Sequence, residues 1–591
     1  MRTMMLAAAA LGLLTTGYAQ DTETTAKLSG SALVDKWVRA KWDEAGLKPV
    51  KRSDDAEFMR RVYLDVVGVI PSLEEAEKFL AEKSMSKRQQ LVEKLVKDER
   101  YGQHWGDIWS GILVGFDSDQ RDQQARAEET QDLKAIFNKN VPYDEFARQV
   151  ITVDGAVYDR YNPNMKSEEN KDLPKEVSLA AYISRQSRVA GRDFPLAMAG
   201  KVTRVFMGVQ IQCAQCHDHP FDKWTQEEFY GMASFFTGLV ARQQTYTPPE
   251  AKNEKDPNAK RRMEIRYYTV HDRDDNAKKP ETPREKMQAM RGGGGMDLRI
   301  PDSKGGPVKA SFLETGKGVE TGTSRRTTFA KYITDPSNLQ FAKMTVNRYW
   351  AQFLGAGIVN PPDDFNGRNK PSHPELLTEL AQDFIAHRYD LHWLIKTITS
   401  SEAYNLTSRA GKERDPQAEK YLALSRVRPL SPEQIMRSLM EAVDFGEGAI
   451  GKRLGLGRPA RPGMAAGGDD MKERVFQQMV RQFRYSFGDD EGGEVAEFSG
   501  TIPSALLMMN GQVTGSGTTA SFRGSSFSEL LAKHSSPQDK VRAIFLKALS
   551  RAPSTGEMSR WTGHASKAGG EKGYEDCMWT LLNTSEFLFN H

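Results

Sequence analysis

Residues 72–80 read SLEEAEKFL, and this stretch decides the fold class. Ser72 followed three residues later by Glu75 is typical of a capping box, in which the two side chains bind the free backbone N–H groups at the start of a helix. Ala76 and Phe79 follow at helical spacing, so one face of this predicted helix is apolar.

Similar start signals recur along the chain. Each pairs a serine or threonine with an acidic or amide residue three positions later, or places proline at the first helical position, where its missing N–H is not needed. They occur at Thr225–Glu228, Ser372–Glu375, Ser431–Gln434, Ser536–Pro537 and Ser554–Glu557. The pattern predicts a mainly α fold with two helical domains, residues 30–240 and 326–591.

Residues 241–325, between these domains, have a different composition. Pro248-Pro249 and the tetraglycine at 292–295 break helices. Two short stretches, 263–270 and 308–313, are compatible with strands. We therefore predict an irregular, partly β insert. A second loop-rich stretch, 446–468, interrupts the C-terminal half.

The first nineteen residues predict export. Arg2 precedes an apolar run over 6–14, and Gly17-Tyr18-Ala19 has the small residues of a cleavage site, so residues 1–19 resemble a secretory signal peptide. The apolar run is shorter than the roughly 20 residues needed to cross a bilayer. We expect a periplasmic or extracellular protein with no membrane span after removal of this peptide.

The charges are almost balanced, because 82 Lys and Arg residues face 79 Asp and Glu residues, for a net charge of +3. A chain with so small a net charge does not attract a polyanion strongly, so no nucleic-acid partner is predicted. The sequence also lacks a Gly-x-Ser-x-Gly elbow and a His-Glu-x-x-His zinc helix. Whether the protein is an enzyme stays open.

The strongest chemical signal is Cys213-Ala214-Gln215-Cys216-His217. Covalent attachment of c-type haem needs two thiols at this spacing and a histidine just beyond them as an iron ligand. Two alternatives stay open. The cysteines could form a disulfide, or the thiols could join His217 and His219 in binding Zn or Fe directly.

A second axial ligand for haem iron is not evident from the sequence. Met198, Met207, Met232 and His104 are candidates, but methionines at helical spacing are typical core residues.

The motif continues as His-Asp-His-Pro-Phe-Asp to Asp222, and this sequence resembles the planctomycete-type secreted cytochrome-like proteins, which pair two domains of unknown function. The resemblance implies haem c on Cys213 and Cys216 with His217 as ligand, export, and a role in electron transfer or extracellular polymer metabolism. It extends over residues 58–65, 142–146, 346–350, 363–365, 372–377, 549–551 and 579–587.

Polar residues in the C-terminal half also have two interpretations. Arg348, Asp363 and Asp364 could line a binding pocket, or they could bridge and cap helices. His373 fits the first position of a helix, and Cys577 in an apolar segment fits a buried thiol.

Two functions follow from the sequence. The first is an exported c-type haem protein that transfers electrons or supports a redox enzyme. The alternative is a secreted, non-redox binding or scaffold protein whose Cys-His cluster is a structural metal or disulfide site. The partner would be a redox protein or a saccharide.

Overall fold

The computed structural model confirms the mainly α fold. It describes residues 28–115, 120–158, 173–273, 282–283, 298–301, 305–409, 414–443, 476, 480, 518–519, 526–569 and 571–591. The predicted signal peptide, the tetraglycine and the loop-rich stretch at 446–468 lie outside these residues. Within them, no helix is both long and apolar enough to span a bilayer.

The N-terminal part of the chain is a succession of helices joined by short connections. Helix α3 begins with the predicted capping box, since Ser72 accepts from the Glu75 N–H and Glu75 accepts from the Ser72 N–H. The elements are α1 (Ser31–Ala45), α2 (Asp55–Val67), α3 (Leu73–Ala81), α4 (Lys87–Leu95), α5 (Glu99–Val114), α6 (Gln120–Asn138), α7 (Tyr143–Thr152), η1 (Ser178–Ala180), α8 (Ala181–Ala190), η2 (Gly191–Asp193), α9 (Phe194–Met207), η3 (Gln212–Gln215), α10 (Gln226–Ala233) and η4 (Ser234–Phe236).

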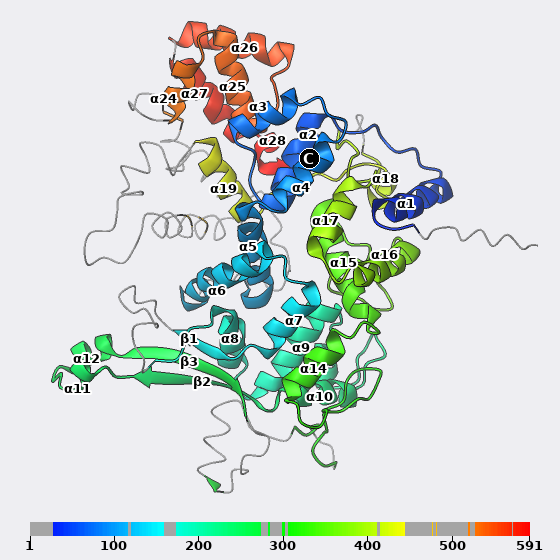
Figure 1. Cartoon of the computed structure of the whole chain (residues 1–591), viewed down its shortest axis with the longest axis vertical. Coiled ribbons are helices and arrows are strands. Elements are labelled where there is room, and N and C mark those ends of the chain that lie inside the picture. The colour runs from blue at the N-terminus through cyan, green and yellow to red at the C-terminus, as the bar shows by residue number, and fades with distance from the viewer. Residues whose placement is uncertain are drawn as a thin grey trace, which may run out of the picture.

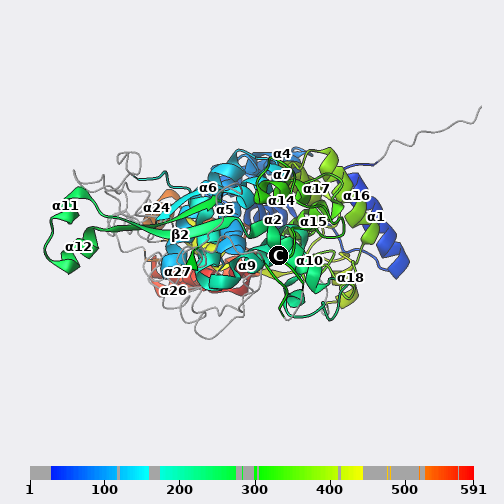
Figure 2. The ribbon, with the colours of Figure 1, turned by 90° about the horizontal axis from the view of Figure 1, so that it is seen from below.

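An antiparallel sheet in the order β1-β3-β2 projects from the helices. Its strands are β1 (Gly155–Tyr158), β2 (Leu239–Tyr246) and β3 (Ile265–Asp272), and the short helices α11 (Pro249–Lys252) and α12 (Pro257–Met263) connect β2 to β3. Figures 1 and 2 both show the β2–β3 hairpin reaching away from the helical body, with α11 and α12 at its tip. Strand β3 confirms the prediction at 263–270. The prediction of a strand at 308–313 is wrong, because that segment has no regular structure and covers α10.

The C-terminal part is again helical, and three of its predicted start signals are confirmed at Ser431, Ser536 and Ser554. The predicted box at Ser372 is wrong, because the helix begins one residue later and Ser372 Oγ contacts His373 Nδ1 instead. The elements are α14 (Arg325–Ile333), α15 (Leu339–Leu354), α16 (Pro374–Ala386), α17 (Leu391–Ser400), α18 (Pro416–Lys420), β4 (Arg428–Pro429), α19 (Pro432–Ala442), α24 (Ser526–Lys533), α25 (Pro537–Leu549), α26 (Thr555–Ala568), α27 (Glu571–Leu582), α28 (Ser585–Leu588) and β5 (Phe589–Asn590).

Helix α2 connects two hydrophobic cores. Phe58 and Val62 belong to a large core that contains side chains from Val34 to Ala423. Leu64, on the same helix, belongs to a second core built mainly from α19 and the helices α24–α28. Figure 1 shows these C-terminal helices gathered around α2 and α3. Side chains on both sides of the predicted insert therefore share the large core.

Gly68 ends α2 in the left-handed conformation, with φ of 69°. A Cβ atom at this position would lie 2.3 Å from Nδ1 of the buried His104. We expect Gly68→Ala to lower the free energy of unfolding by about 3 kcal/mol, from backbone strain plus displacement of the imidazole. Gly46→Ala is the matched control, because Gly46 has φ of 65° but open space around its Cβ. Urea unfolding that gave equal losses for both variants would contradict the predicted contact.

Candidate functional site

The Cys-x-x-Cys-His motif lies on a loop between two helices. Helix α9 ends before Gly208, Cys213 lies in the short helix η3, and α10 begins after the capping residue Thr225. The loop is closed by a hydrogen bond from the His219 N–H to the Trp224 carbonyl at 2.8 Å. A second bond, from Gln226 Nε2 to the Gln215 carbonyl at 2.9 Å, joins η3 to the start of α10. The motif is thus held between two fixed helix ends.

Both motif thiols are accessible. Cys213 and Cys216 are exposed and free, whereas Ala214 between them is buried and anchors the turn. The third cysteine, Cys577, is buried as predicted, and burial raises the pKa of its thiol well above the usual range. Cys213 and Cys216 are therefore the thiols available for chemistry.

His217 is exposed beside the thiols, and its tautomer follows from its contact. Nδ1 lies 2.7 Å from the Asp218 carbonyl oxygen, which only accepts hydrogen bonds, so Nδ1 carries the hydrogen. In the neutral form of the ring Nε2 carries the lone pair, and no hydrogen bond of Nε2 occurs among the described residues. A metal-binding histidine has this arrangement, because the bond at one nitrogen orients the other toward the metal. Two accessible thiols and an oriented imidazole fit the donor set of a c-type haem.

His219 has a different role. Its Nδ1 accepts a hydrogen bond from the Phe221 N–H at 3.2 Å, so that nitrogen is engaged in shaping the loop. In the part of the chain that the structure describes, no three His, Cys, Asp or Glu side chains are grouped so as to hold a metal ion. Direct binding of Zn or Fe by His217 and His219 stays a prediction.

The side chains considered as second axial ligands are buried. Met198, Met207 and Met232 are at most 6% exposed, and the Met232 sulfur accepts from the Leu313 N–H at 3.4 Å. His104 is buried against Gly68. All four side chains are core residues in this structure.

Burial of His104 makes stability depend on pH. Burial lowers the pKa of its imidazole to about 3, well below the ordinary value of about 6.5. Below pH 6.5 the unfolded chain binds a proton that the folded chain does not, so stability falls as the pH falls toward 3. Between pH 7 and pH 5 we expect this residue to reduce the free energy of unfolding by about 2 kcal/mol. Urea titrations of wild type and His104→Asn should differ in pH dependence by that amount, and equal dependence would contradict the prediction.

A loop of the C-terminal part, residues 359–371, contacts the end of α9 and the loop that carries the motif. The Phe365 N–H donates to the Gly208 carbonyl at 2.8 Å, and Asp363 forms an ion pair with Arg204 of α9. The Arg368 guanidinium lies 3.7 Å from the centre of the exposed Phe221 ring. The motif loop is therefore supported by both halves of the chain.

The predicted polar residues hold this arrangement together. Arg348 donates to the Val205 carbonyl at 2.7 Å and lies over the Trp109 ring, whereas Asp364 accepts from Asn369 at 2.8 Å. Arg348 and Asp363, which pairs with Arg204, therefore connect their segments to α9, whereas Asp364 shapes its own loop. These contacts favour the structural interpretation over a shared binding pocket.

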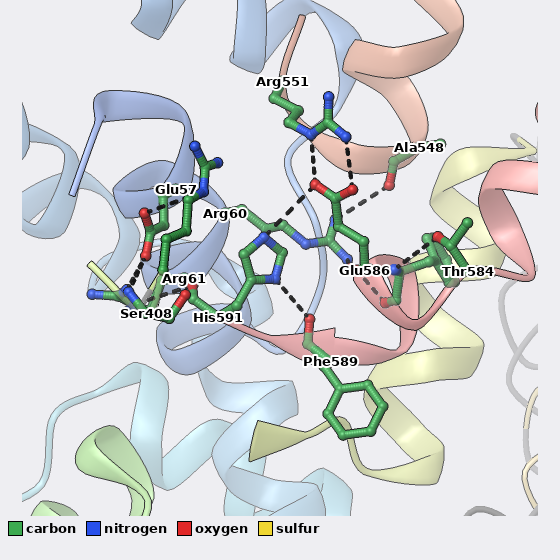
Figure 3. Close-up of polar contacts among 12 residues, drawn as sticks. Glu57, Arg60, Arg61, Ser408, Ala548, Arg551, Thr584, Glu586, Phe589 and His591 are labelled. Atoms are coloured by element: carbon green, nitrogen blue, oxygen red, sulfur yellow. Dashed lines mark hydrogen bonds and ion pairs between the residues drawn. The ribbon is translucent and has the colours of Figure 1, made fainter. Parts of the chain in front are cut away.

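A second polar cluster lies where the last residues meet α2. Figure 3 shows the hydrogen-bonded pair of Arg551 and Glu586. It also shows Arg60, which donates hydrogen bonds to backbone carbonyl groups of the C-terminal helices. A cavity of about 820 Å³ borders Arg551, Glu557 and Glu586. Hydrogen bonding to Arg551 lowers the pKa of Glu557 to about 2. Burial raises the pKa of Glu586, but the hydrogen bond and charge of Arg551, together with the charges of His591 and Arg60, lower it overall. Both carboxyl groups are ionised at neutral pH, so neither serves as a general acid.

Two family models match the chain in tandem. Residues 33–241 match PSCyt2, described as a protein of unknown function (DUF1549), and residues 325–565 match PSD1, described as a protein of unknown function (DUF1553). No curated protein and no solved structure matches the chain. The matches confirm the two-domain part of the predicted resemblance. Its cytochrome-like part stays a prediction.

Sequence reasoning found the motif residues but missed two supports of their loop. Arg204 and Arg368 carry no motif signal, because their partners are 159 and 147 residues away in the chain.

Proposed function

We propose that this chain, with its tandem PSCyt2 and PSD1 domains, is an exported c-type haem protein that exchanges single electrons with a partner at its surface. The observation that carries the proposal is the hydrogen bonding and exposure of the His217 side chain. Its Nδ1 is bound to the Asp218 carbonyl, and its exposed side chain follows directly on two free, exposed thiols in the sequence. Export rests on the sequence of residues 1–19.

Each motif residue has a distinct task in this proposal. The thiols of Cys213 and Cys216 would bind the haem covalently, and His217 Nε2 would be an axial ligand of its iron. When bound, the haem supplies one-electron oxidation and reduction. Because Cys213, Cys216 and His217 are exposed, the attached group would be accessible to a partner without an opening of the fold.

The loop and the domain behind it keep the motif in place. The bond from the His219 N–H to the Trp224 carbonyl holds the loop closed, and the Arg204–Asp363 ion pair holds the 359–371 loop against α9. A fixed ligand and a fixed surface favour electron transfer, because little rearrangement accompanies the change of charge.

The experiment is coexpression of the full chain with a c-type cytochrome maturation system, followed by visible spectra of the purified protein. We expect wild type to retain its pigment after denaturation and to show a reversible change on reduction with dithionite. Cys213→Ala and Cys216→Ala should each lose at least one thioether bond, and the double variant should be colourless. Cys577→Ala is the matched control and should behave as wild type. A colourless wild type with both motif thiols intact or disulfide-bonded would overturn the proposal and favour the non-redox binding protein.

A further inference from the structure

A cavity of about 600 Å³ lies beside the motif loop. One wall is the chain just beyond the motif, Asp222–Trp224, and the opposite wall is the start of α15 with the loop around Phe365. The cavity does not include the motif thiols or His217, so it is a separate feature of the surface.

Helix α15 carries three polar side chains at helical spacing, Gln340, Lys343 and Asn347, and two of them are engaged in hydrogen bonds. Gln340 Nε2 donates to the Met207 carbonyl at 2.7 Å, and Asn347 Nδ2 donates to the Val359 carbonyl at 2.8 Å. Lys343 lies between them at helical spacing and lines the cavity. Its ammonium group has neither a hydrogen bond nor an ion pair among the described residues.

The other charged groups around the cavity are satisfied. Lys223 pairs with Glu314, and Lys317 lies over the Tyr332 ring. Asp222 accepts from the Lys223 N–H, and Asp335 accepts from Ser337. Lys343 is half-buried, and burial lowers the pKa of its amine, while none of the described carboxylates lies within ion-pair distance of it. A partly desolvated cation without a counter-ion is costly, and an anionic ligand would remove that cost.

We propose that this cavity binds an organic carboxylate, with the carboxylate on Lys343 Nζ and the body of the ligand against the apolar wall of Met207 and Phe365. A singly charged group fits better than a phosphate, because the other two lining lysines, Lys223 and Lys317, are already engaged. Three carboxylates, Asp222, Glu314 and Asp335, also line the cavity and would repel a more highly charged anion. Phosphate sites normally gather arginines or several backbone N–H groups, and none of the described lining residues is an arginine.

The test is calorimetric titration of the full chain with two carboxylates, glucuronate and benzoate, which differ in the organic group that carries the charge. Glucose and benzyl alcohol are the uncharged comparison compounds. At least one carboxylate should bind wild type and bind Lys343→Met about tenfold or more weakly, as expected for loss of one charge-assisted hydrogen bond. Lys343→Arg should retain binding. Lys331→Met is the matched control, because Lys331 is exposed, lies outside the cavity lining and pairs with Glu320.

Two results would overturn this proposal: no binding of either carboxylate at about 10 mM, or equal binding by wild type and Lys343→Met. Thermal melting of each variant separates a loss of folding from a loss of binding. The proposal does not depend on haem, and a Cys213→Ala/Cys216→Ala variant should bind the same carboxylate. Its success or failure is therefore distinguishable from that of the electron-transfer proposal.

Discussion

Replacing Arg61 by methionine should lower the free energy of unfolding by about 3 to 5 kcal/mol, because it breaks a buried ion pair and leaves its partner charged. Arg61 and Glu57 are 2% and 3% exposed, and their ion pair measures 2.8 Å. Figure 3 shows Arg61 beside Glu57. The same guanidinium donates to the Tyr404 and Leu406 carbonyls, so one side chain joins α2 to the segment after α17.

The control for this prediction is Arg39→Met, which removes an exposed ion pair with Glu402. Solvent screening makes such a pair weak, and we expect no measurable change in unfolding. The double variant Glu57→Met/Arg61→Met should recover part of the loss, since it leaves no unpaired charge. If urea unfolding gave Arg61→Met and Arg39→Met the same free energy of unfolding, the buried Arg61 would not hold α2 to the segment after α17.

Replacing His217 by glycine should change the iron coordination while leaving the pigment covalently attached. The thiols that would hold the haem remain, but the ligand at Nε2 is lost. Because His217 is exposed, imidazole added to the solution has access to the vacated position and should restore the wild-type spectrum. The reduction potential should shift with the ligand and return with imidazole.

The matched control is His219→Gly, two residues away on the same loop. His219 uses its Nδ1 to accept from the Phe221 N–H, so its loss should loosen the loop without changing the iron ligand. A spectrum altered by His219→Gly and unaffected by His217→Gly would contradict the assignment of the axial ligand.

The sequence predicted the features that depend on neighbours in the chain. The capping boxes at Ser72, Thr225 and Ser554 act over three residues, and the Cys213–His217 spacing is also local. The box at Ser372 failed because the helix start there is set by Pro374, after which Ser372 is free to bond His373 and the Ile358 carbonyl.

Features that depend on distant partners could not be predicted in this way. Arg61 pairs with Glu57 one helical turn away, but its burial comes from Tyr404 and Leu406, more than 340 residues along the chain. The support of the motif loop by Asp363 and Arg368 has the same origin. That Lys343 has no ion-pair partner among the described residues can be recognised only from the positions of the surrounding side chains in the fold.

The most direct test of the central claim is mass spectrometry of the full chain purified from a host that attaches c-type haem. The proposal predicts an intact mass increased by one haem, with the modification on the peptide that contains Cys213 and Cys216 and with neither thiol reactive to an alkylating reagent. An unmodified mass, with both thiols alkylated before or after reduction, would contradict it.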